Sequence, residues 1–230
     1  MQANIFRHKR KLARTAFCFT LLLSLSAALL PRAYAQSHTD RKFSPETGAI
    51  VNTTIELMNA DDFKASLANM DELLENHELT PFEKSTILQI KGQAFYEVKQ
   101  TGKAIQAFED AIDAGGLLDS ETSQLRLNIG QLLIGDGQYA RGAEMIEQWE
   151  HDGNQLTPNH IELLVQAWVS SDNYARALPW AEKWFETANP KERKHYNLLN
   201  FLYNHLGLNV RQSILLDEMK ERWPEDFEDK

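Results

Sequence analysis

The segment LQIKGQAFYEVKQTGKAIQAFEDA, residues 88–111, decides the fold of this 230-residue chain. Its small and bulky residues follow the i, i+4, i+7 spacing of one helical face twice, with a turn at residues 100–102 between the two runs. Glycine inside a helix costs about 1 kcal/mol relative to alanine, so Gly92 indicates a packing requirement. We therefore expect two antiparallel helices that cross closely at Gly92 and Ala104. The two runs are Leu88, Gly92 and Phe95, then Ala104, Phe108 and Ala111.

Small residues recur in register with this segment along the chain. They are 38, 38, 35 and 36 residues apart. A period in the mid-thirties is the signature of a helical solenoid, in which one repeat cannot bury its apolar face alone. No stretch alternates convincingly between polar and apolar residues, so we expect almost no strand. The predicted fold is all-α, a right-handed α-α superhelix of about five helix pairs. The recurring residues are Ser66, Ala104, Gly142, Ala177 and Ser213.

The residue types in 88–111 resemble the consensus of the tetratricopeptide repeat (TPR), which has hydrophobic, glycine and aromatic positions on its first helix and Ala, Phe, Ala on its second. The resemblance implies a TPR-like solenoid with repeats at about 44–79, 80–117, 118–156, 157–189 and 190–224. Small and aromatic residues at the helix crossings form a structural seam, which is the part least available to a partner. The seam residues are Ser66, Gly92, Ala104, Phe108, Ala111, Gly130, Gly142, Ala177 and Ser213.

A capping residue followed by proline marks the expected start of several first helices. Glu83 stands at the third helical position after Thr80, where it can complete a capping box. Glu192 is predicted to do the same after Asn189. The cap-proline pairs are Ser44-Pro45, Thr80-Pro81, Thr157-Pro158 and Asn189-Pro190.

The first 35 residues have the features of a cleavable Sec-type signal peptide. A basic region at residues 7–14 precedes an apolar run at residues 16–30, and Ala33-Tyr34-Ala35 forms a small-x-small cleavage site. We predict cleavage after Ala35, a periplasmic chain and no stable membrane span after cleavage; an uncleaved anchor is the alternative. Residues 36–43 are predicted to be a flexible leader and residues 225–230 a polar tail.

The charge of the chain changes once the signal peptide is removed. Without residues 1–35, the chain has 18 basic and 33 acidic residues, a net charge of −15, and no cysteine. Such an acidic surface disfavours nucleic acid and anionic membranes. It suits either a basic partner or simple solubility. Disulfide and thiol chemistry are excluded for the mature chain.

No residue pattern indicates catalysis, a cofactor or a metal site. The six histidines after residue 35 form neither His-Glu-x-x-His nor a Cys/His zinc spacing, and no nucleophile elbow or phosphate-binding glycine loop occurs. Adjacent acids such as Glu109 and Asp110 point to different sides of a helix, so we interpret them as solvated surface. We therefore predict a binding protein without enzymatic activity.

The TPR resemblance also implies where a partner binds. In TPR arrays generally, the first helices line a concave face that takes extended peptides or helices, and Gly92 sets the register of that face here. Three glutamines recur at one register position, where they either hydrogen-bond a partner's backbone or form ordinary polar surface. Trp180 and Trp184 are expected in the core, with a groove lining as the alternative. The candidate partner-binding residues are Gln89, Gln93, Tyr96, Leu127, Gln131, Glu162, Gln166 and Val169.

Two further runs resemble periplasmic TPR proteins of Gram-negative bacteria that are associated with TonB, ExbB and ExbD. They are Leu79-Thr80-Pro81-Phe82-Glu83-Lys84 and Tyr196-Asn197-Leu198-Leu199 with Trp223-Pro224, and the similarity extends from about Phe43 to Trp223. It implies an accessory scaffold that binds a TonB- or ExbD-like segment and supports nutrient uptake across the outer membrane. A scaffold for outer-membrane or cell-wall assembly is the alternative. A helical periplasmic enzyme is a third hypothesis.

Overall fold

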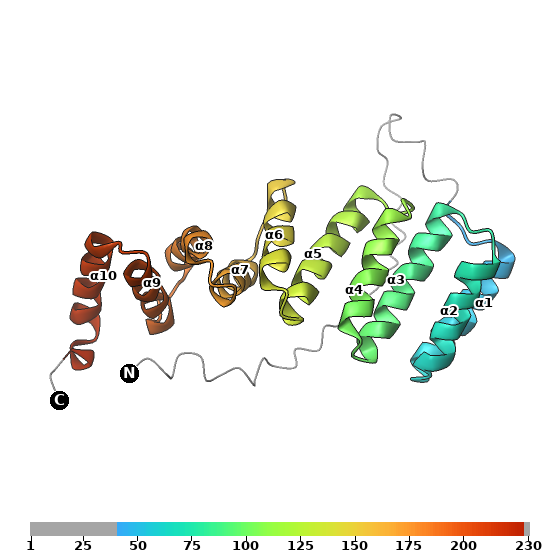
Figure 1. Cartoon of the computed structure of the whole chain (residues 1–230), viewed down its shortest axis with the longest axis horizontal. Helices are drawn as coiled ribbons and strands as arrows, with labels where there is room; N and C mark the ends of the chain where they lie inside the picture. The colour runs from blue at the N-terminus through green and yellow to red at the C-terminus, as the bar shows by residue number, and fades with distance from the viewer. Residues whose placement is uncertain (1–40, 228–230) are drawn as a thin grey trace. The chain divides into compact units, whose positions relative to one another are not determined.

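The computed structural model describes residues 41–227, so the predicted signal peptide, most of the leader and the end of the tail lie outside the described residues. The described part contains ten α-helices and a short 3-10 helix without any strand, which confirms the all-α prediction. The helices follow one another side by side in chain order (Figure 1). The elements are α1 (Pro45–Asn59), α2 (Phe63–Asn76), α3 (Pro81–Glu97), α4 (Thr101–Asp113), α5 (Asp119–Gly135), α6 (Tyr139–His151), α7 (Pro158–Ser170), α8 (Tyr174–Thr187), α9 (Arg193–His205), α10 (Asn209–Arg222) and η1 (Pro224–Asp226).

Successive helices form five pairs, α1/α2, α3/α4, α5/α6, α7/α8 and α9/α10. The second helix of each pair also packs on the first helix of the next pair. Three clusters of buried apolar side chains run along these contacts, one over α1–α3, one around α3–α6 and the largest from α5 to α10. The structure is therefore the predicted solenoid of five helix pairs.

In α1/α2, α5/α6 and α9/α10, one residue of the first helix contacts the residue twelve positions later on the second helix. We call these two residues, and those in the same register of the other helix pairs, the crossing pair. In α5/α6, a Cβ added to Gly142 would lie 2.6 Å from the carbonyl oxygen of Gly130, so the two backbones touch. In α1/α2, the Ser66 hydroxyl lies 3.4 Å from the carbonyl oxygen of Thr54. The crossing pairs by this register are Thr54/Ser66, Gly92/Ala104, Gly130/Gly142, Val165/Ala177 and Asn200/Gln212.

The fifth repeat departs from the predicted seam. Ser213 is exposed, whereas the other four recurring small residues are buried at the fourth position of α2, α4, α6 and α8. Because α10 begins at Asn209, its fourth residue is Gln212. The Gln212 amide donates to Asn200 Oδ1 at 3.0 Å. The crossing is thus made by a side-chain hydrogen bond, and the seam position is one residue earlier than Ser213.

The turn inside each pair places one residue in the left-handed backbone region. Three of these residues are not glycine, with φ of 59° at Asp61, 62° at Lys99 and 57° at Asp172. Gly137 and Gly207 occupy the corresponding positions with φ of 87° and 67°. All five stand seven positions after the crossing residue of the first helix, so the turn geometry repeats as closely as the crossing does.

Helix caps agree with the sequence at three of the four predicted starts and differ at the fourth. Ser44 caps α1, where its hydroxyl accepts from the Thr47 backbone N–H. Glu83 completes the capping box of α3: it accepts from the Thr80 backbone N–H at 2.9 Å, and also from the Ser44 N–H at 2.8 Å. In α7, Thr157 is capped reciprocally by His160. The prediction for Asn189 was wrong, because α9 begins three residues later with Glu192 as its N-cap and His195 in the capping position.

The described ends of the chain make specific contacts. Arg41, inside the predicted leader, binds both carboxylate oxygens of Glu121 at 2.7 and 2.8 Å. The Phe43 ring lies 5.4 Å from that of Phe82. At the other end, Arg193 of α9 forms ion pairs with Glu225 and with Asp226 of η1. These contacts fasten residues 41–43 and 225–226 to the helices.

Candidate functional site

One row of side chains runs along all five first helices, one position after each crossing residue. These side chains are at least partly accessible, and Ile55 is 42% exposed. Three of the five are glutamines, so the middle of the row offers amides and its ends offer apolar groups. We call this set the glutamine row: Ile55, Gln93, Gln131, Gln166 and Phe201.

The three glutamines differ in their partners. The Gln93 amide donates to Glu97 at 2.7 Å, and the Gln166 amide donates to Glu162 at 3.2 Å. In both, the amide nitrogen is engaged and the amide oxygen remains an acceptor. Gln131 Oε1 is buried and has no hydrogen-bond partner among the described residues. Gln93 and Gln166 therefore present acceptors that suit backbone N–H donors, whereas the Gln131 oxygen is not exposed to a partner.

Two residues expected on the binding face lie in the core instead. Leu127 is only 4% exposed and Val169 only 7%, and both belong to the apolar cluster of the later repeats. Neighbouring helix pairs cover these positions, so they cannot contact a partner directly. Tyr96 is 37% exposed, while Gln89 and Glu162 are half-buried. Fewer of the predicted partner-binding residues are therefore accessible than the register set by Gly92 indicated.

Aromatic rings gather at the α9 end of the glutamine row. Tyr174, at the start of α8, lies 5.4 Å from the Phe201 ring and 4.2 Å from the His205 ring, measured between centroids. The Tyr174 hydroxyl donates to Asp172 at 2.8 Å, and this hydrogen bond raises the pKa of Tyr174. The three rings are half-buried or exposed, so this end offers an aromatic surface next to the amides.

A second row, on the second helices, was missed by the sequence reasoning. Arg141, Arg176 and Arg211 stand one position before the crossing residues of α6, α8 and α10. Each forms an ion pair with a glutamate on the preceding second helix. Their spacing of 35 residues is visible in the sequence and could have revealed the row. The pairs are Arg141 with Glu109, Arg176 with Glu144 and Glu147, and Arg211 with Glu182.

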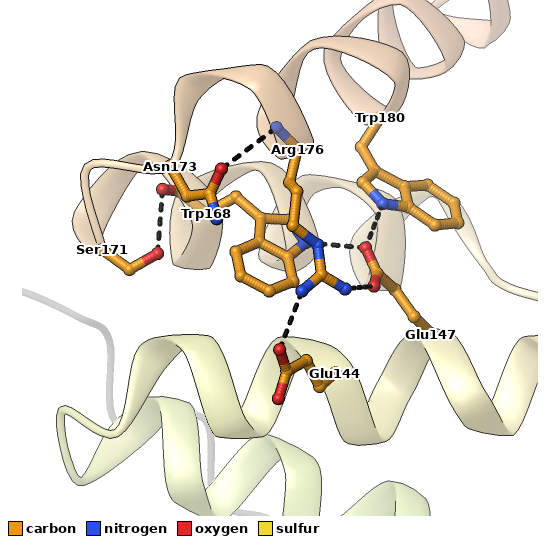
Figure 2. A network of polar contacts seen from close by, with 7 residues as sticks. All are labelled: Glu144, Glu147, Trp168, Ser171, Asn173, Arg176 and Trp180. Carbon is orange, nitrogen blue, oxygen red and sulfur yellow. Dashed lines mark hydrogen bonds and ion pairs between the residues drawn. The ribbon is translucent and has the colours of Figure 1, made fainter.

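Glu147 is the centre of the most connected part of this second row. Figure 2 shows its carboxylate between Arg176 and Trp180. It accepts from the indole nitrogens of Trp168 at 2.7 Å and Trp180 at 2.6 Å, and it pairs with Arg176. The Arg176 guanidinium also lies 3.7 Å from the centroid of Trp168. This network joins α6 to α7 and α8, so these tryptophans act structurally.

Two buried tyrosines make similar connections in the last repeats. Tyr196 donates to Glu218, and Tyr203 donates to Glu182 at 3.0 Å. Burial, followed by the hydrogen bond to the glutamate, raises the pKa of each tyrosine to about 12. Both hydroxyls therefore stay protonated at neutral pH and serve as donors that hold neighbouring helices together.

The described residues offer neither a metal site nor a membrane span. Among residues 41–227, no group of three or more histidine, cysteine, aspartate or glutamate side chains could hold a metal ion. None of the helices in that range is both long and apolar enough to cross a membrane. The glutamine row and its aromatic end remain the candidate site.

Comparisons with known proteins identify the fold but not a family. No protein-family model and no curated protein matches the chain. Among solved structures, MamA 41-end from Desulfovibrio magneticus RS-1 superimposes with a TM-score of 0.52 and 14% identity, covering 82% of this chain and 100% of that one. A MamA RS-1 double mutant gives a TM-score of 0.54 at 14% identity, with 82% and 100% covered.

A further structure links this architecture to a named repeat. YrrB, described as a TPR protein with an unusual peptide-binding site, superimposes with a TM-score of 0.52 and 16% identity, covering 76% of this chain and 85% of YrrB. At such identity the likeness concerns the fold alone. The chain therefore has a TPR-like fold, as the residue pattern of 88–111 predicted.

Proposed function

We propose that this chain is a non-catalytic scaffold that binds a partner protein along the glutamine row. The observation that carries the proposal is the row itself: three glutamines at one register position of a TPR-like solenoid, with aromatic rings at one end. Amide oxygens that are not engaged internally can accept from the backbone N–H groups of an extended segment. YrrB, which has this fold and is described as binding peptide, supports the same reading.

The rest of the proposal concerns place and partner. The predicted signal peptide supports a periplasmic location, and the two runs that resemble TonB-associated TPR proteins favour a TonB- or ExbD-like periplasmic segment as the partner. Binding such a segment would make the chain an accessory to nutrient uptake across the outer membrane. Main-chain recognition by amides fits this role, because it tolerates sequence variation in the bound segment.

Site-specific photocrosslinking in living cells tests the partner. A photoreactive residue at Gln131 should capture a TonB- or ExbD-like protein. Gln106, an exposed glutamine on the second helix α4, is the matched control and should capture none. Capture of an outer-membrane or cell-wall assembly component from Gln131 would replace the TonB assignment with the assembly scaffold. Equal capture from both positions would overturn the row as the binding face.

Deleting the gene tests the pathway separately. If the chain serves a TonB-type system, uptake through at least one TonB-dependent receptor should fall in the deletion strain and return when the gene is restored. A variant with alanine at Gln93, Gln131 and Gln166 should fail to restore it while remaining folded. Unchanged uptake through every such receptor would exclude the nutrient-uptake role.

A further inference from the structure

The third repeat lacks an apolar residue that every other repeat has. Four positions before the crossing residue of the first helix, the chain has Ile50, Leu88, Ile161 and Tyr196 in the other repeats, but Arg126 in α5. The last three of these apolar side chains are buried, whereas Arg126 is exposed. The apolar filling between the two helices of the third pair is therefore incomplete.

A pocket of about 500 Å³ lies at this gap. It is bounded by the first two turns of α5, the end of α6 and the loop that follows α6. Trp149 lines it from α6, at the register position where other repeats bury Leu73, Ala111, Trp184 and Met219. Trp149 itself is only half-buried.

Hydrogen bonds fix the wall formed by the loop. The Asn154 amide donates to the backbone carbonyl of Trp149 at 2.8 Å, and the Gln148 amide donates to Asp152 at 2.8 Å. On the opposite wall, Asp119, Ser123 and Arg126 lie on one face of α5. Both walls are therefore built by ordered elements of the fold.

Two side-chain donors at the pocket have no acceptor among the described residues, and only one of them is exposed to it. The indole nitrogen of Trp149 is buried and unpartnered within residues 41–227. Within the same range, the Arg126 guanidinium forms neither an ion pair nor a side-chain hydrogen bond. A buried unpaired donor destabilises a protein unless something accepts from it. The Arg126 guanidinium is exposed at the pocket and carries donors only, so an acceptor-rich ligand can take the place of the water around it. The Trp149 indole nitrogen is buried within the wall and does not itself contact a ligand.

We propose that this pocket binds a carboxylate group of a partner peptide, with Arg126 as its ligand and the Trp149 ring as part of the adjoining wall. Arginine pairs with carboxylates through two parallel hydrogen bonds, which gives both charge and geometry. Asp119 and Asp152 stand at exposed positions of the same pocket, where they attract the N–H groups of the bound peptide and disfavour free dianions. Asp119 and Arg126 are seven residues apart, about 10 Å along the helix, which a short peptide can span.

The bound carboxylate comes either from a chain end or from a glutamate side chain. This site is separate from the glutamine row, so its test does not depend on the TonB-type partner. The probes are three short peptides: acetylated trialanine with a free C-terminus, its C-terminal amide, and acetylated, amidated Ala-Glu-Ala. The readout is the indole N–H resonance of Trp149 in NMR spectra of the mature chain, assigned with Trp149→Phe among the five tryptophans.

Free trialanine should shift the Trp149 resonance saturably, and its amide should not. Arg126→Leu installs the residue that repeat two has at this position, so it should stay folded while binding falls about tenfold or more. Arg141→Leu, which removes an exposed arginine elsewhere, is the matched control and should bind as the wild type does. Saturable binding of only the glutamate peptide would assign a side-chain carboxylate as the source.

Several results would overturn the site. They are the absence of a saturable shift with both carboxylate peptides, equal binding of the amide, and unchanged binding by Arg126→Leu. Equal weakening by Arg141→Leu would also overturn it, because the effect would then follow net charge instead of the pocket.

Discussion

The second and third repeats rely on glycine where their two helices meet, whereas the fourth and fifth rely on larger side chains. Gly130 and Gly142 let the backbones of α5 and α6 touch, and Gly92 leaves room for the Phe108 ring of α4 against α3. In α9/α10, Asn200 and Gln212 are joined by a hydrogen bond. The caps differ in the same way. Glu83 completes the capping box of α3, and Glu121 accepts from the Leu118 backbone N–H at the start of α5, but histidines occupy the equivalent positions in α7 and α9.

This difference shows that one helical geometry can rest on two kinds of interaction with different sensitivities. Backbone contact at glycine depends on volume and is independent of pH. Histidine caps, buried tyrosine–glutamate hydrogen bonds and the Glu147 network depend on the protonation state of the side chains and on individual donor and acceptor atoms. The second and third repeats should therefore respond to substitutions that add volume, and the fourth and fifth to substitutions or pH changes that remove a hydrogen bond.

The largest effect is expected at the glycine crossing. In Gly142→Leu, the side chain would start 2.6 Å from the Gly130 carbonyl oxygen and 2.9 Å from the Ile134 amide nitrogen, so the helices must separate. Overpacking of this kind costs about 1–3 kcal/mol or more, and contact with backbone places the cost at the upper end. Urea denaturation should show the loss.

Alanine substitutions give the matched comparison. Alanine normally stabilises a helix by about 1 kcal/mol relative to glycine. Gly102→Ala should show that gain, since an added Cβ there meets nothing within 4 Å, whereas Gly142→Ala should destabilise. An equal gain at both positions would mean that α5 and α6 do not touch at this crossing.

The next largest effect is expected where the third repeat meets the fourth, at Glu147 of α6. Glu147→Ala leaves two indole donors and Arg176 without their shared acceptor, which should cost about 1–3 kcal/mol. Glu109→Ala breaks a single exposed pair with Arg141 and should cost less than about 1 kcal/mol. Chemical denaturation of both variants checks the ranking. Similar costs would show that the network adds nothing beyond an ordinary ion pair.

The fold could be predicted from the sequence because close contact between helices requires small residues at the crossings of the first four repeats. The crossing of the fifth repeat could not be predicted, because Asn200 and Gln212 are polar and match no small-residue pattern. Leu127 and Val169 were wrongly predicted to lie on the binding face. The register was derived from a single helix pair, so it could not show that the neighbouring pair covers these two side chains. Arg126 was readable as a departure from the repeat, but the pocket beside it depends on the loop after α6.

A smaller effect is expected from pH at the histidine cap of α7. His160 Nδ1 accepts from the Thr157 backbone N–H at 3.3 Å, so the cap requires the neutral ring, and burial lowers the pKa of His160 below 6.5. Its stabilisation is present above pH 6.5 and is lost as the pH falls through the lowered value. The loss should reach about 1 kcal/mol, the typical contribution of a cap.

His160→Glu installs the cap of the glycine-built half and should remove this pH dependence. Burial raises the pKa of Glu83, but hydrogen bonds from Ser44 and Thr80 outweigh it, so the net shift is downward from 4.5. The stabilisation by Glu83 is therefore lost only as the pH falls below 4.5, outside the histidine window. The free energy of unfolding, measured by denaturation at pH 7.5 and 5.5, should fall at the lower pH in the wild type and stay constant in the variant. The same change in both proteins would exclude the His160 cap as the cause.

The smallest effect is expected at the turns between the two helices of each pair. Their backbone geometry is the same in all five repeats, so they serve as a reference for the differences described above. Lys99 holds φ at 62°, a conformation that glycine adopts without a clash at Cβ. Lys99→Gly should stabilise the chain by about 0.5–1 kcal/mol, because relief of the left-handed strain exceeds the added entropy of the unfolded chain. Gly137→Lys, the reverse change at the equivalent turn, should destabilise by a similar amount. If Lys99→Gly destabilised in urea denaturation, backbone strain would not govern these turns, and the lysine side chain would itself stabilise the second repeat.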